Sequence, residues 1–258
     1  MIKKSFFNSQ HTVIAALLKG VNIEDCIHQC RDAEFAGADG IAVELCLLPQ
    51  ELRTKENFAR IMQEVRLPFM FCLYRNDITY GGDDEKRMQV LLEAARAGAE
   101  VIDIMGDLYD PSPRELTFNE TAVRKQKEMI ARIHEIGAKV IISSHMNQSL
   151  KAEEVLEHLR TQASRGADMV KIVTGIHNEE ELVEAIRTTM LLNRELTIPF
   201  VHLGTGSHSR LHRYIGMQLG VAVEFAVPDY HRSNALFSQP TIASFKAVQH
   251  NLHWHINE

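Results

Sequence analysis

The strongest constraint on the fold is a regular alternation between short apolar runs and longer amphipathic segments along the chain. Runs rich in Val, Ile and Phe recur eight times, and each precedes a stretch with the apolar spacing of a helix. Because the runs are apolar throughout, they predict parallel strands buried on both faces. The runs are 12–18, 40–45, 68–73, 100–105, 139–144, 168–173, 199–203 and 221–226.

The amphipathic segments end on glycine. Gly37, Gly98, Gly137 and Gly166 each stand shortly before the next apolar run, where a helix would stop. Repeated helix, glycine and strand predict an α/β fold, with one domain over residues 1–258 that closes into a (β/α)8 TIM barrel. An open doubly wound sheet is the alternative, but its glycine-rich dinucleotide fingerprint is missing after the first run.

Composition excludes several classes of function. The net charge of −6, with both signs mixed along 258 residues, argues against a nucleic-acid partner. No apolar run approaches the roughly 18 residues of a membrane helix, and Met1 is not followed by a leader pattern, so we expect a cytoplasmic protein with no membrane partner. The cysteines form no CxxC pair and should be buried thiols: Cys26, Cys30, Cys46 and Cys72.

One lysine, Lys171, interrupts the apolar run 168–173. In an arbitrary strand, such a lysine more often reaches solvent or pairs with a carboxylate. In a barrel of parallel strands, the active site lies at the C-terminal strand ends, and a low-dielectric cavity favours the neutral amine that can attack a ketone. Lys171 is therefore the candidate Schiff-base nucleophile.

A reactive-looking group lies at or near the end of each run from the second onwards: Glu44, Arg75, Asp103, His145, Lys171, His202 and Glu224. His145, on the strand next to Lys171, could move protons at an imine nitrogen, although a lone histidine is more often structural. Glu44 could orient this histidine or pair with the lysine, and a helix-capping or surface role is the alternative. Asp103 would be costly to bury unpaired, so it should meet one of the two bases.

Two arginines indicate a small anionic substrate. Arg75 and Arg210 follow the third and seventh runs, where a guanidinium could hold a carboxylate through two hydrogen bonds. The segment 204–210 could equally bind phosphate, as barrels often do at this place. Gln239, after the eighth run, could hydrogen-bond substrate hydroxyls from a lid.

The 13 histidines of the chain suggest a metal site as one possible feature. His208 and His212 are four residues apart, and His253 lies close to His255. Neither pair has a carboxylate or cysteine at a known ligand spacing, so we expect neither a metal nor another cofactor.

Together these residues resemble type I 3-dehydroquinate dehydratase over nearly the whole chain. The resemblance rests on the order of Glu44, Arg75, Ser144-His145, Asp168 to Lys171, Ser209-Arg210 and Gln239. It implies a (β/α)8 barrel, usually a homodimer, that acts through a lysine Schiff base in the shikimate pathway of aromatic amino acid biosynthesis.

The resemblance also implies a role for each matched residue. Lys171 corresponds to the Schiff-base lysine, His145 to the general acid and base, and Arg210 to the arginine that holds the substrate carboxylate. Substrate hydroxyls would be bound, or the site supported, by Glu44, Arg75 and Gln239. Lys171 would attack C3 of 3-dehydroquinate, a proton would leave C2, and the C1 hydroxyl would leave as water to give 3-dehydroshikimate.

Three positions depart from the family pattern. Cys46 stands where the family has an arginine, and Ala235 where it has a serine near the lid glutamine. The loop after the third run has no glutamate before Glu85, although the family uses one there to support the histidine. A divergent relative acting on another hydroxylated keto acid therefore stays open. So do a non-catalytic barrel that binds a carboxylated or phosphorylated metabolite, and a phosphosugar aldolase or epimerase.

Overall fold

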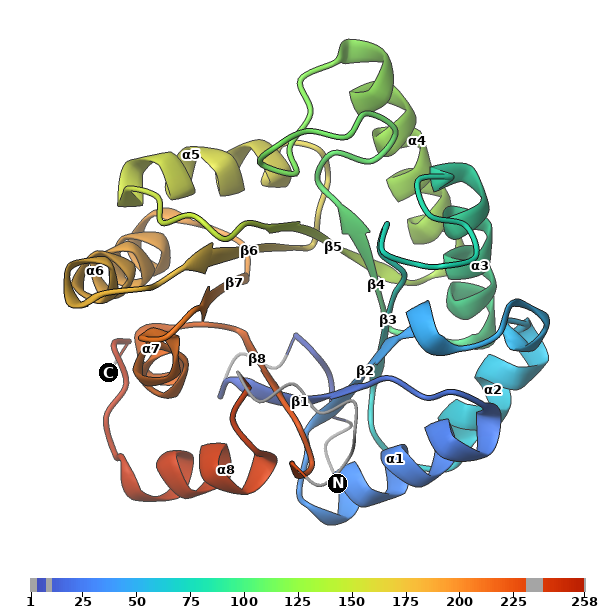
Figure 1. The fold of residues 1–258 in the computed structure, drawn as a ribbon, viewed down its shortest axis with the longest axis horizontal. Coiled ribbons are helices and arrows are strands. Elements are labelled where there is room, and N and C mark those ends of the chain that lie inside the picture. The colour runs from blue at the N-terminus through green and yellow to red at the C-terminus, as the bar shows by residue number, and fades with distance from the viewer. Residues whose placement is uncertain (1–3, 8–10, 231–238, 258) are drawn as a thin grey trace.

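The computed structural model describes residues 4–7, 11–230 and 239–257, which form a (β/α)8 barrel (Figure 1). All strand pairs are parallel, in the order β7-β6-β5-β4-β3-β2-β1-β8. The Ala222 amide donates to the Phe200 carbonyl at 2.9 Å, which joins the starts of the two outer strands and nearly closes the barrel. The strands are β1 (Val13–Leu18), β2 (Gly40–Glu44), β3 (Phe69–Cys72), β4 (Val101–Met105), β5 (Lys139–His145), β6 (Met169–Gly175), β7 (Phe200–Thr205) and β8 (Val223–Ala226). The predicted barrel and its eight apolar strands are confirmed.

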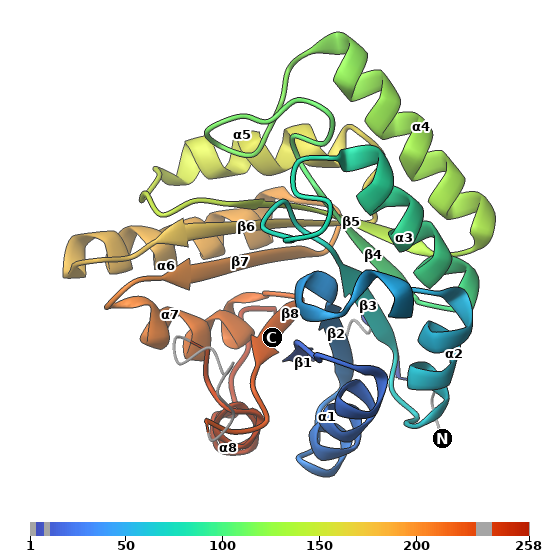
Figure 2. The same ribbon diagram turned by 45° about the vertical axis from the view of Figure 1, so that its right-hand side comes forward.

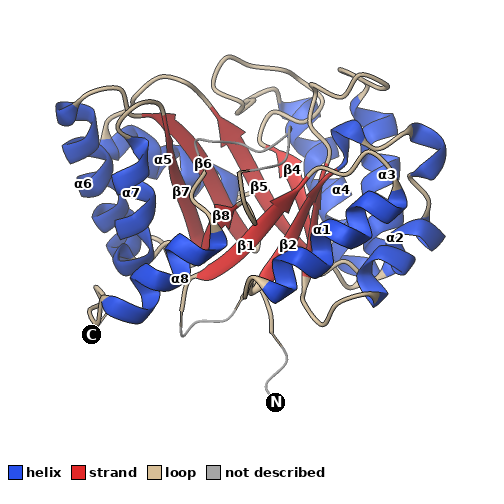
Figure 3. Cartoon of the chain, turned by 60° about the horizontal axis from the view of Figure 1, so that its bottom comes forward, coloured by secondary structure: helices blue, strands red, loops and turns tan. Residues whose placement is uncertain are grey.

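Helices surround the strands on the outside (Figure 3). They are α1 (Ile23–Phe35), α2 (Lys55–Gln63), α3 (Asp84–Ala97), α4 (Glu120–Ile136), α5 (Ala152–Ala163), α6 (Glu179–Glu195), α7 (Ser209–Gly216) and α8 (Ile242–Asn251). The predicted stops are confirmed for Gly98 and Gly137, which cap α3 and α4 at φ angles of 110° and 96°. Within the described ranges, no helix is long and apolar enough to cross a bilayer.

The pleat of the strands decides which side chains enter the barrel. Residues at alternate positions, such as Val101 and Met169, pack inside it, while their neighbours pack against the helices. Asp103 and Lys171 lie two residues further along the same strands and therefore face the interior at the C-terminal end. Figure 2 shows the strands converging around this interior.

The same pleat turns two predicted strand-end groups away from the interior. Val201 and Leu203 point inward, so His202 between them points to the helix layer, where its Nδ1 meets Thr189 Oγ1 at 2.9 Å. Glu224 lies outside in the same way and comes close to α7. The expectation that these two residues lie at a strand-end site is therefore wrong for His202. Glu224 does not enter the barrel either, but it lies 4.0 Å from Arg213 of α7.

Buried histidines make the stability of the fold depend on pH. Burial lowers the pKa of His202 from 6.5 to about 4, and burial together with Arg114 and Arg165 does the same for His158. Between pH 6.5 and 4 the unfolded chain therefore binds more protons than the folded one. This contribution to stability is complete above pH 6.5 and is lost as the pH falls, by about 1.4 kcal/mol per pH unit for each histidine.

We expect urea titrations at pH 7.5, 5.5 and 4.5 to show this loss. In His202→Gln the free energy of unfolding should depend less steeply on pH, by roughly one histidine's share of about 1.4 kcal/mol per unit. Equal slopes for the variant and the wild type would contradict the prediction that His202 stays neutral in the folded state.

Candidate active site

A cavity of about 380 Å³ opens at the C-terminal end of the barrel. Of the predicted site residues, five line it: Lys171, His145, Glu44, Arg75 and Gln239. The remaining lining residues are Leu17, Lys19, Ala42, Met70, Cys72, Tyr74, Asn76, Asp103, Met105, Glu115, Val173, Leu203, Thr205, Arg213 and Phe225. Apolar side chains form its lower wall, and charged groups lie at the strand ends, as expected for a ligand site of this size.

Lys171 lies at the centre of the charged groups, with its side chain only 6% exposed. Its Nζ is 3.1 Å from Asp103 Oδ2 and 3.0 Å from the Tyr74 hydroxyl. Tyr74 in turn donates to the same Asp103 oxygen at 2.7 Å. Burial, then the charge of Asp103, raises the pKa of Tyr74 well above its ordinary value, so the phenol stays protonated. The predicted meeting of Asp103 with one of the bases is confirmed, and its partner is Lys171.

Further hydrogen bonds hold Asp103 and the backbone of Lys171 in place. The Ser143 hydroxyl donates to Asp103 Oδ1, which leaves the other carboxylate oxygen to Lys171 and Tyr74. On the outer side of the strand, the Gln162 side chain accepts from the Lys171 amide and donates to the Lys171 carbonyl, both at 3.2 Å. The lysine is therefore held by both its backbone and its amine.

His145 borders the same cavity and is oriented by Glu115. Its Nδ1 lies 3.0 Å from Glu115 Oε2, and its backbone amide donates to the same oxygen at 2.7 Å. A carboxylate accepts hydrogen bonds, so Nδ1 carries a proton and Nε2 is the basic nitrogen of the neutral ring. The His145 ring contacts Tyr74 edge-on, with centroids 5.0 Å apart. A proton carrier thus lies beside the phenol that touches Lys171.

The backbone of Glu115 is held in an uncommon conformation. Its φ angle of 48° is left-handed, which non-glycine residues rarely adopt. The Ser144 hydroxyl donates to its carbonyl at 2.6 Å, and its amide donates to the Ser112 carbonyl at 3.0 Å. A Cβ at Gly106 would lie 2.4 Å from that Glu115 carbonyl, so only glycine fits there. Such strain is typical of functional positions.

We expect Glu115→Gln to lower kcat about 10-fold, because the amide keeps the shape but can no longer fix the His145 tautomer through an ionised oxygen. Steady-state kinetics should show a much smaller change in KM. As a matched control, Glu157→Gln on the exposed side of α5 should leave kcat within twofold. A Glu115→Gln enzyme as active as the wild type would rule out this support for His145.

Glu44 neither orients His145 nor pairs with Lys171, contrary to both expectations. Its Oε2 lies 2.8 Å from Lys19 Nζ, at the end of β1. The Cys46 thiol is close to Glu44 and donates to Asn76 Oδ1 at 3.2 Å. The cavity therefore holds a cation beside Glu44 although the sequence has no arginine at position 46.

Of the two predicted arginines, Arg75 lines the cavity and Arg210 does not. Arg75 lines the cavity, but its guanidinium is bound to Asp107 at 2.7 Å and to Asp84 at 3.3 Å, which ties the β3 end to the next loop. Arg210 lies outside the cavity lining, is exposed, and contacts Tyr230 with its guanidinium 5.8 Å from the ring centroid. The arginine of α7 that does line the cavity is Arg213.

Arg213 is buried and keeps hydrogen-bonding capacity. Its Nε donates to the Gly204 carbonyl at 3.0 Å, whereas its Nη1 makes no hydrogen bond within the described part of the chain. Glu224 Oε2 is 4.0 Å from Nη1, a long separation for an ion pair, and burial raises the pKa of Glu224 and lowers that of Arg213. The charge of Arg213 is therefore weakly compensated at the cavity wall.

The remaining predicted features are placed as follows. Gln239 lines the cavity, and its buried Oε1 has no hydrogen bond within the described ranges. Ala235 and most of the predicted lid fall in 231–238, outside the described residues. All four cysteines are buried and free. In the part of the chain that the structure describes, no three His, Cys, Asp or Glu residues lie together as a metal site.

Sequence reasoning missed four residues of the site: Lys19, Tyr74, Glu115 and Arg213. Tyr74 and Lys19 each lie just beyond the end of a strand, where an active site of a barrel is expected. Their positions in the sequence could therefore have identified both. Arg213 lies one helical turn after Arg210 on the buried face of α7. Glu115 has no such signal, because it lies in a loop ten residues after β4.

The family model of the type I 3-dehydroquinases matches residues 14–255. The chain belongs to the type I 3-dehydroquinase family. It is 28% identical to 3-dehydroquinate dehydratase of Alkaliphilus oremlandii over 131 residues, which is 50% of each protein. It is 30% identical to that of Geobacillus kaustophilus over 148 residues, which covers 56% of this chain and 52% of the relative. The chain thus spans about half the length of these curated relatives.

Solved structures of the family have the same fold. The type I 3-dehydroquinate dehydratase of Clostridium difficile superposes with a TM-score of 0.78 at 19% identity, covering 94% of this chain and 93% of that one. The Geobacillus kaustophilus enzyme gives 0.76 at 16% identity, with 93% and 90% covered. The barrel of this chain is therefore the barrel of its family.

Proposed function

We propose that this chain dehydrates 3-dehydroquinate to 3-dehydroshikimate through a Schiff base on Lys171. The observation that carries the proposal is the buried amine held between Asp103 and Tyr74 at 3.1 and 3.0 Å, in a cavity that His145 also lines. Membership of the type I 3-dehydroquinase family supports the same substrate. The activity is that of a carbon-oxygen lyase.

The first half of the reaction joins the substrate to the enzyme. The ammonium of Lys171 passes a proton to the neighbouring Asp103 carboxylate, and the neutral amine attacks the C3 ketone. Neutral His145 relays a proton from the nitrogen of the adduct to its oxygen, which gives the carbinolamine. Asp103 then gives its proton to that hydroxyl, water leaves, and an iminium remains. Tyr74 accepts a hydrogen bond from the lysine nitrogen and so fixes its direction of attack.

The second half removes a second water molecule from the substrate. Nε2 of His145 takes a proton from C2, and the electrons pass to the iminium nitrogen to form an enamine. The enamine expels the C1 hydroxyl, which leaves with a proton from His145. Water then hydrolyses the conjugated iminium and releases 3-dehydroshikimate and the free amine. One water is consumed in this hydrolysis and two are released, so the net reaction loses one.

The cavity also provides a site for the substrate carboxylate. Arg213, rather than Arg210, takes this role in our proposal, because the side chain of Arg213 borders the cavity and that of Arg210 does not. Lys19 and Glu44, paired at 2.8 Å, offer a donor and an acceptor to the substrate hydroxyls. Lys19 thus compensates for the arginine that Cys46 replaces, and Glu115 for the missing loop glutamate.

The direct test is the appearance of the conjugated enone on addition of 3-dehydroquinate. We expect ultraviolet absorbance to rise with enzyme concentration, and borohydride added during turnover to attach the reduced substrate to a peptide containing Lys171. Enone formation without a trapped adduct would overturn the Schiff base but keep the dehydration. No enone and no adduct would favour a barrel that only binds its ligand.

The two arginines of α7 give a matched pair of variants. We expect Arg213→Gln to lower kcat/KM about 100-fold, because a buried charge pair with the substrate carboxylate is lost. Arg210→Gln, on the exposed surface, should change it less than threefold. The opposite order of effects, measured by steady-state kinetics, would return the carboxylate role to Arg210.

Two expectations from the sequence stay predictions. We expect a homodimer, which analytical ultracentrifugation would test, and a cytoplasmic location, which fractionation of the source cells would test.

A further inference from the structure

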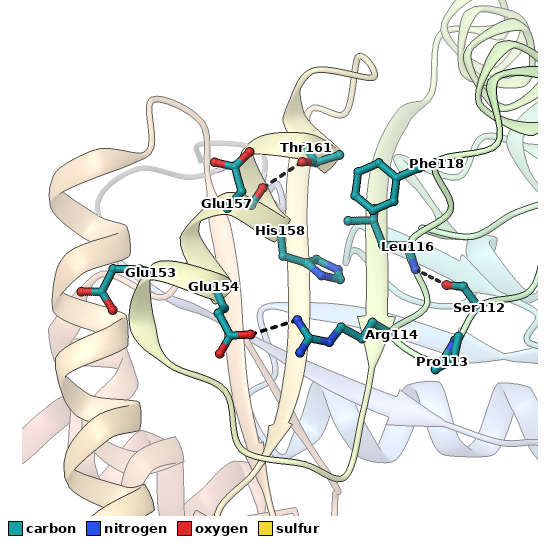
Figure 4. A pocket seen from close by; sticks show the side chains of 10 residues that line it. All are labelled: Ser112, Pro113, Arg114, Leu116, Phe118, Glu153, Glu154, Glu157, His158 and Thr161. Carbon is teal, nitrogen blue, oxygen red and sulfur yellow. Dashed lines mark hydrogen bonds and ion pairs between the residues drawn. The ribbon is translucent and has the colours of Figure 1, made fainter.

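A second cavity, of about 730 Å³, lies on the outside of the barrel between α5 and the loop that follows β4 (Figure 4). Leu116 and Phe118 approach it from the loop, and His158 approaches it from α5. Phe118 is 75% exposed, whereas His158 is 6% exposed. The cavity thus combines an apolar rim with one buried polar ring.

The hydrogen bonds of Ser144 determine the tautomer of His158. The Ser144 hydroxyl donates its hydrogen to the Glu115 carbonyl at 2.6 Å. Its oxygen therefore accepts from both Gln162 Nε2 at 3.0 Å and His158 Nε2 at 2.8 Å. Gln162 is oriented consistently, because its oxygen accepts from the Lys171 amide. His158 Nε2 must carry the proton, and Nδ1 is an acceptor.

This acceptor has no partner in the described part of the protein. Within the described residues, the only hydrogen bond of the His158 side chain is the Nε2 contact with Ser144. Burial, followed by the charges of Arg114 and Arg165, lowers the pKa of His158 to about 4, so the ring is neutral at pH 7. Because Nδ1 is not one of the buried unpaired atoms of the described residues, it is accessible and can accept a hydrogen bond from a ligand.

Charges around the rim restrict the ligand further. The lining contains the carboxylates of Glu153, Glu154 and Glu157 and the guanidinium of Arg114, and Glu153 is paired at 2.8 Å with Arg187, which lies outside the lining. Arg114 is already paired with Glu154 at 3.0 Å, as Figure 4 shows. An anion such as the substrate of the barrel would be repelled, whereas a neutral ring could stack on Phe118.

We propose that this cavity is a second binding site, which takes a small neutral aromatic molecule with one N–H or O–H donor. The donor bonds His158 Nδ1, and the ring packs against Leu116 and Phe118. The site lies directly behind the active-site wall, because Ser144 contacts both His158 and the backbone of Glu115, the residue that orients His145. It is separate from the cavity around Lys171 and does not depend on the reaction proposed there.

Indole and 1-methylindole test the site on the wild-type protein, because they differ in the N–H that His158 should accept. We expect isothermal titration calorimetry to show saturable binding of indole and about fivefold weaker binding of 1-methylindole, the effect of one hydrogen bond. In two-bond ¹H–¹⁵N spectra, the Nδ1 signal of His158 should shift on addition of indole. Equal affinities for the two compounds, or no binding up to the solubility limit of indole, would overturn the proposal.

Two variants locate the binding. Phe118→Ser changes an exposed side chain and should weaken indole binding at least threefold. His158→Phe keeps an aromatic ring but removes the acceptor, so the difference between the two indoles should disappear. If His158→Phe does not fold, Phe118→Ser and the His158 Nδ1 signal still decide the matter. Indole affinity unchanged in Phe118→Ser, together with an unshifted His158 signal, would place the binding elsewhere and refute the site.

Discussion

Replacing Lys171 with methionine should reduce turnover of 3-dehydroquinate by at least about 10⁴-fold, because the other lysine that lines the described cavity, Lys19, is paired with Glu44 at 2.8 Å. Lys171 Nζ is held by Asp103 and Tyr74, and methionine fills a similar volume without a nucleophile. Borohydride trapping followed by mass spectrometry should find no adduct. Equilibrium binding of the substrate should persist, because its carboxylate contacts Arg213 in our proposal.

The matched control is Lys127→Met on the exposed side of α4, which should keep full activity and normal trapping. A Lys171→Met enzyme that retains even 1% of wild-type turnover would mean that the reaction does not pass through this lysine. If the variant is inactive and also fails to bind substrate, the defect lies in the cavity and not in the chemistry. Circular dichroism distinguishes either outcome from unfolding.

Replacing His145 with glutamine should lower kcat by about 10²- to 10⁴-fold, the usual contribution of general acid-base catalysis. The amide can still donate to Glu115, whose oxygen lies 3.0 Å from Nδ1, but it has no basic nitrogen for the C2 proton. Because Lys171 is untouched, the imine should still form slowly. Trapped adduct should therefore be found in an enzyme that hardly turns over.

His250→Gln, at an exposed position of α8, serves as the control and should leave kcat unchanged. A His145→Gln enzyme with normal kcat would show that another group moves the protons, and Tyr74 would be the first to test. Adduct formation as fast as in the wild type would restrict His145 to the later steps. The ratio of trapping rate to kcat thus assigns the histidine to particular proton transfers.

The site differs from the family pattern inferred from the sequence mainly in which strands and loops supply its charges. In our proposal, Lys19, directly after β1, supplies the cation that position 46 lacks, and Glu115, in the loop after β4, supplies the carboxylate that the loop after β3 lacks. These exchanges keep the charges in the cavity while changing their origin in the chain. When sequences are compared position by position, the arginine and the glutamate count as missing, because such a comparison does not show that residues from other segments occupy the same part of the cavity.

The fold could be predicted because it depends on local pattern. Continuous apolar runs, helical spacing and glycines such as Gly98 and Gly137 are each properties of neighbouring residues, and they repeat eight times. Lys171 and His145 could be found for the same reason, because each is an exception within such a run or at its end. The choice between Arg210 and Arg213 could not, since they differ only in which face of α7 meets the barrel.

By itself, the sequence determined the barrel, and it singled out Lys171 and His145 as candidate catalytic residues for a proposed keto-acid substrate. The tertiary structure decided the partners of each charge: Asp103 for Lys171, Glu115 for His145, Lys19 for Glu44. It also turned His202 and Glu224 out of the barrel through the pleat of β7 and β8. The physical reason is that strand and helix periodicity are encoded within a few residues, whereas an ion pair depends on where distant strands and loops bring two side chains together.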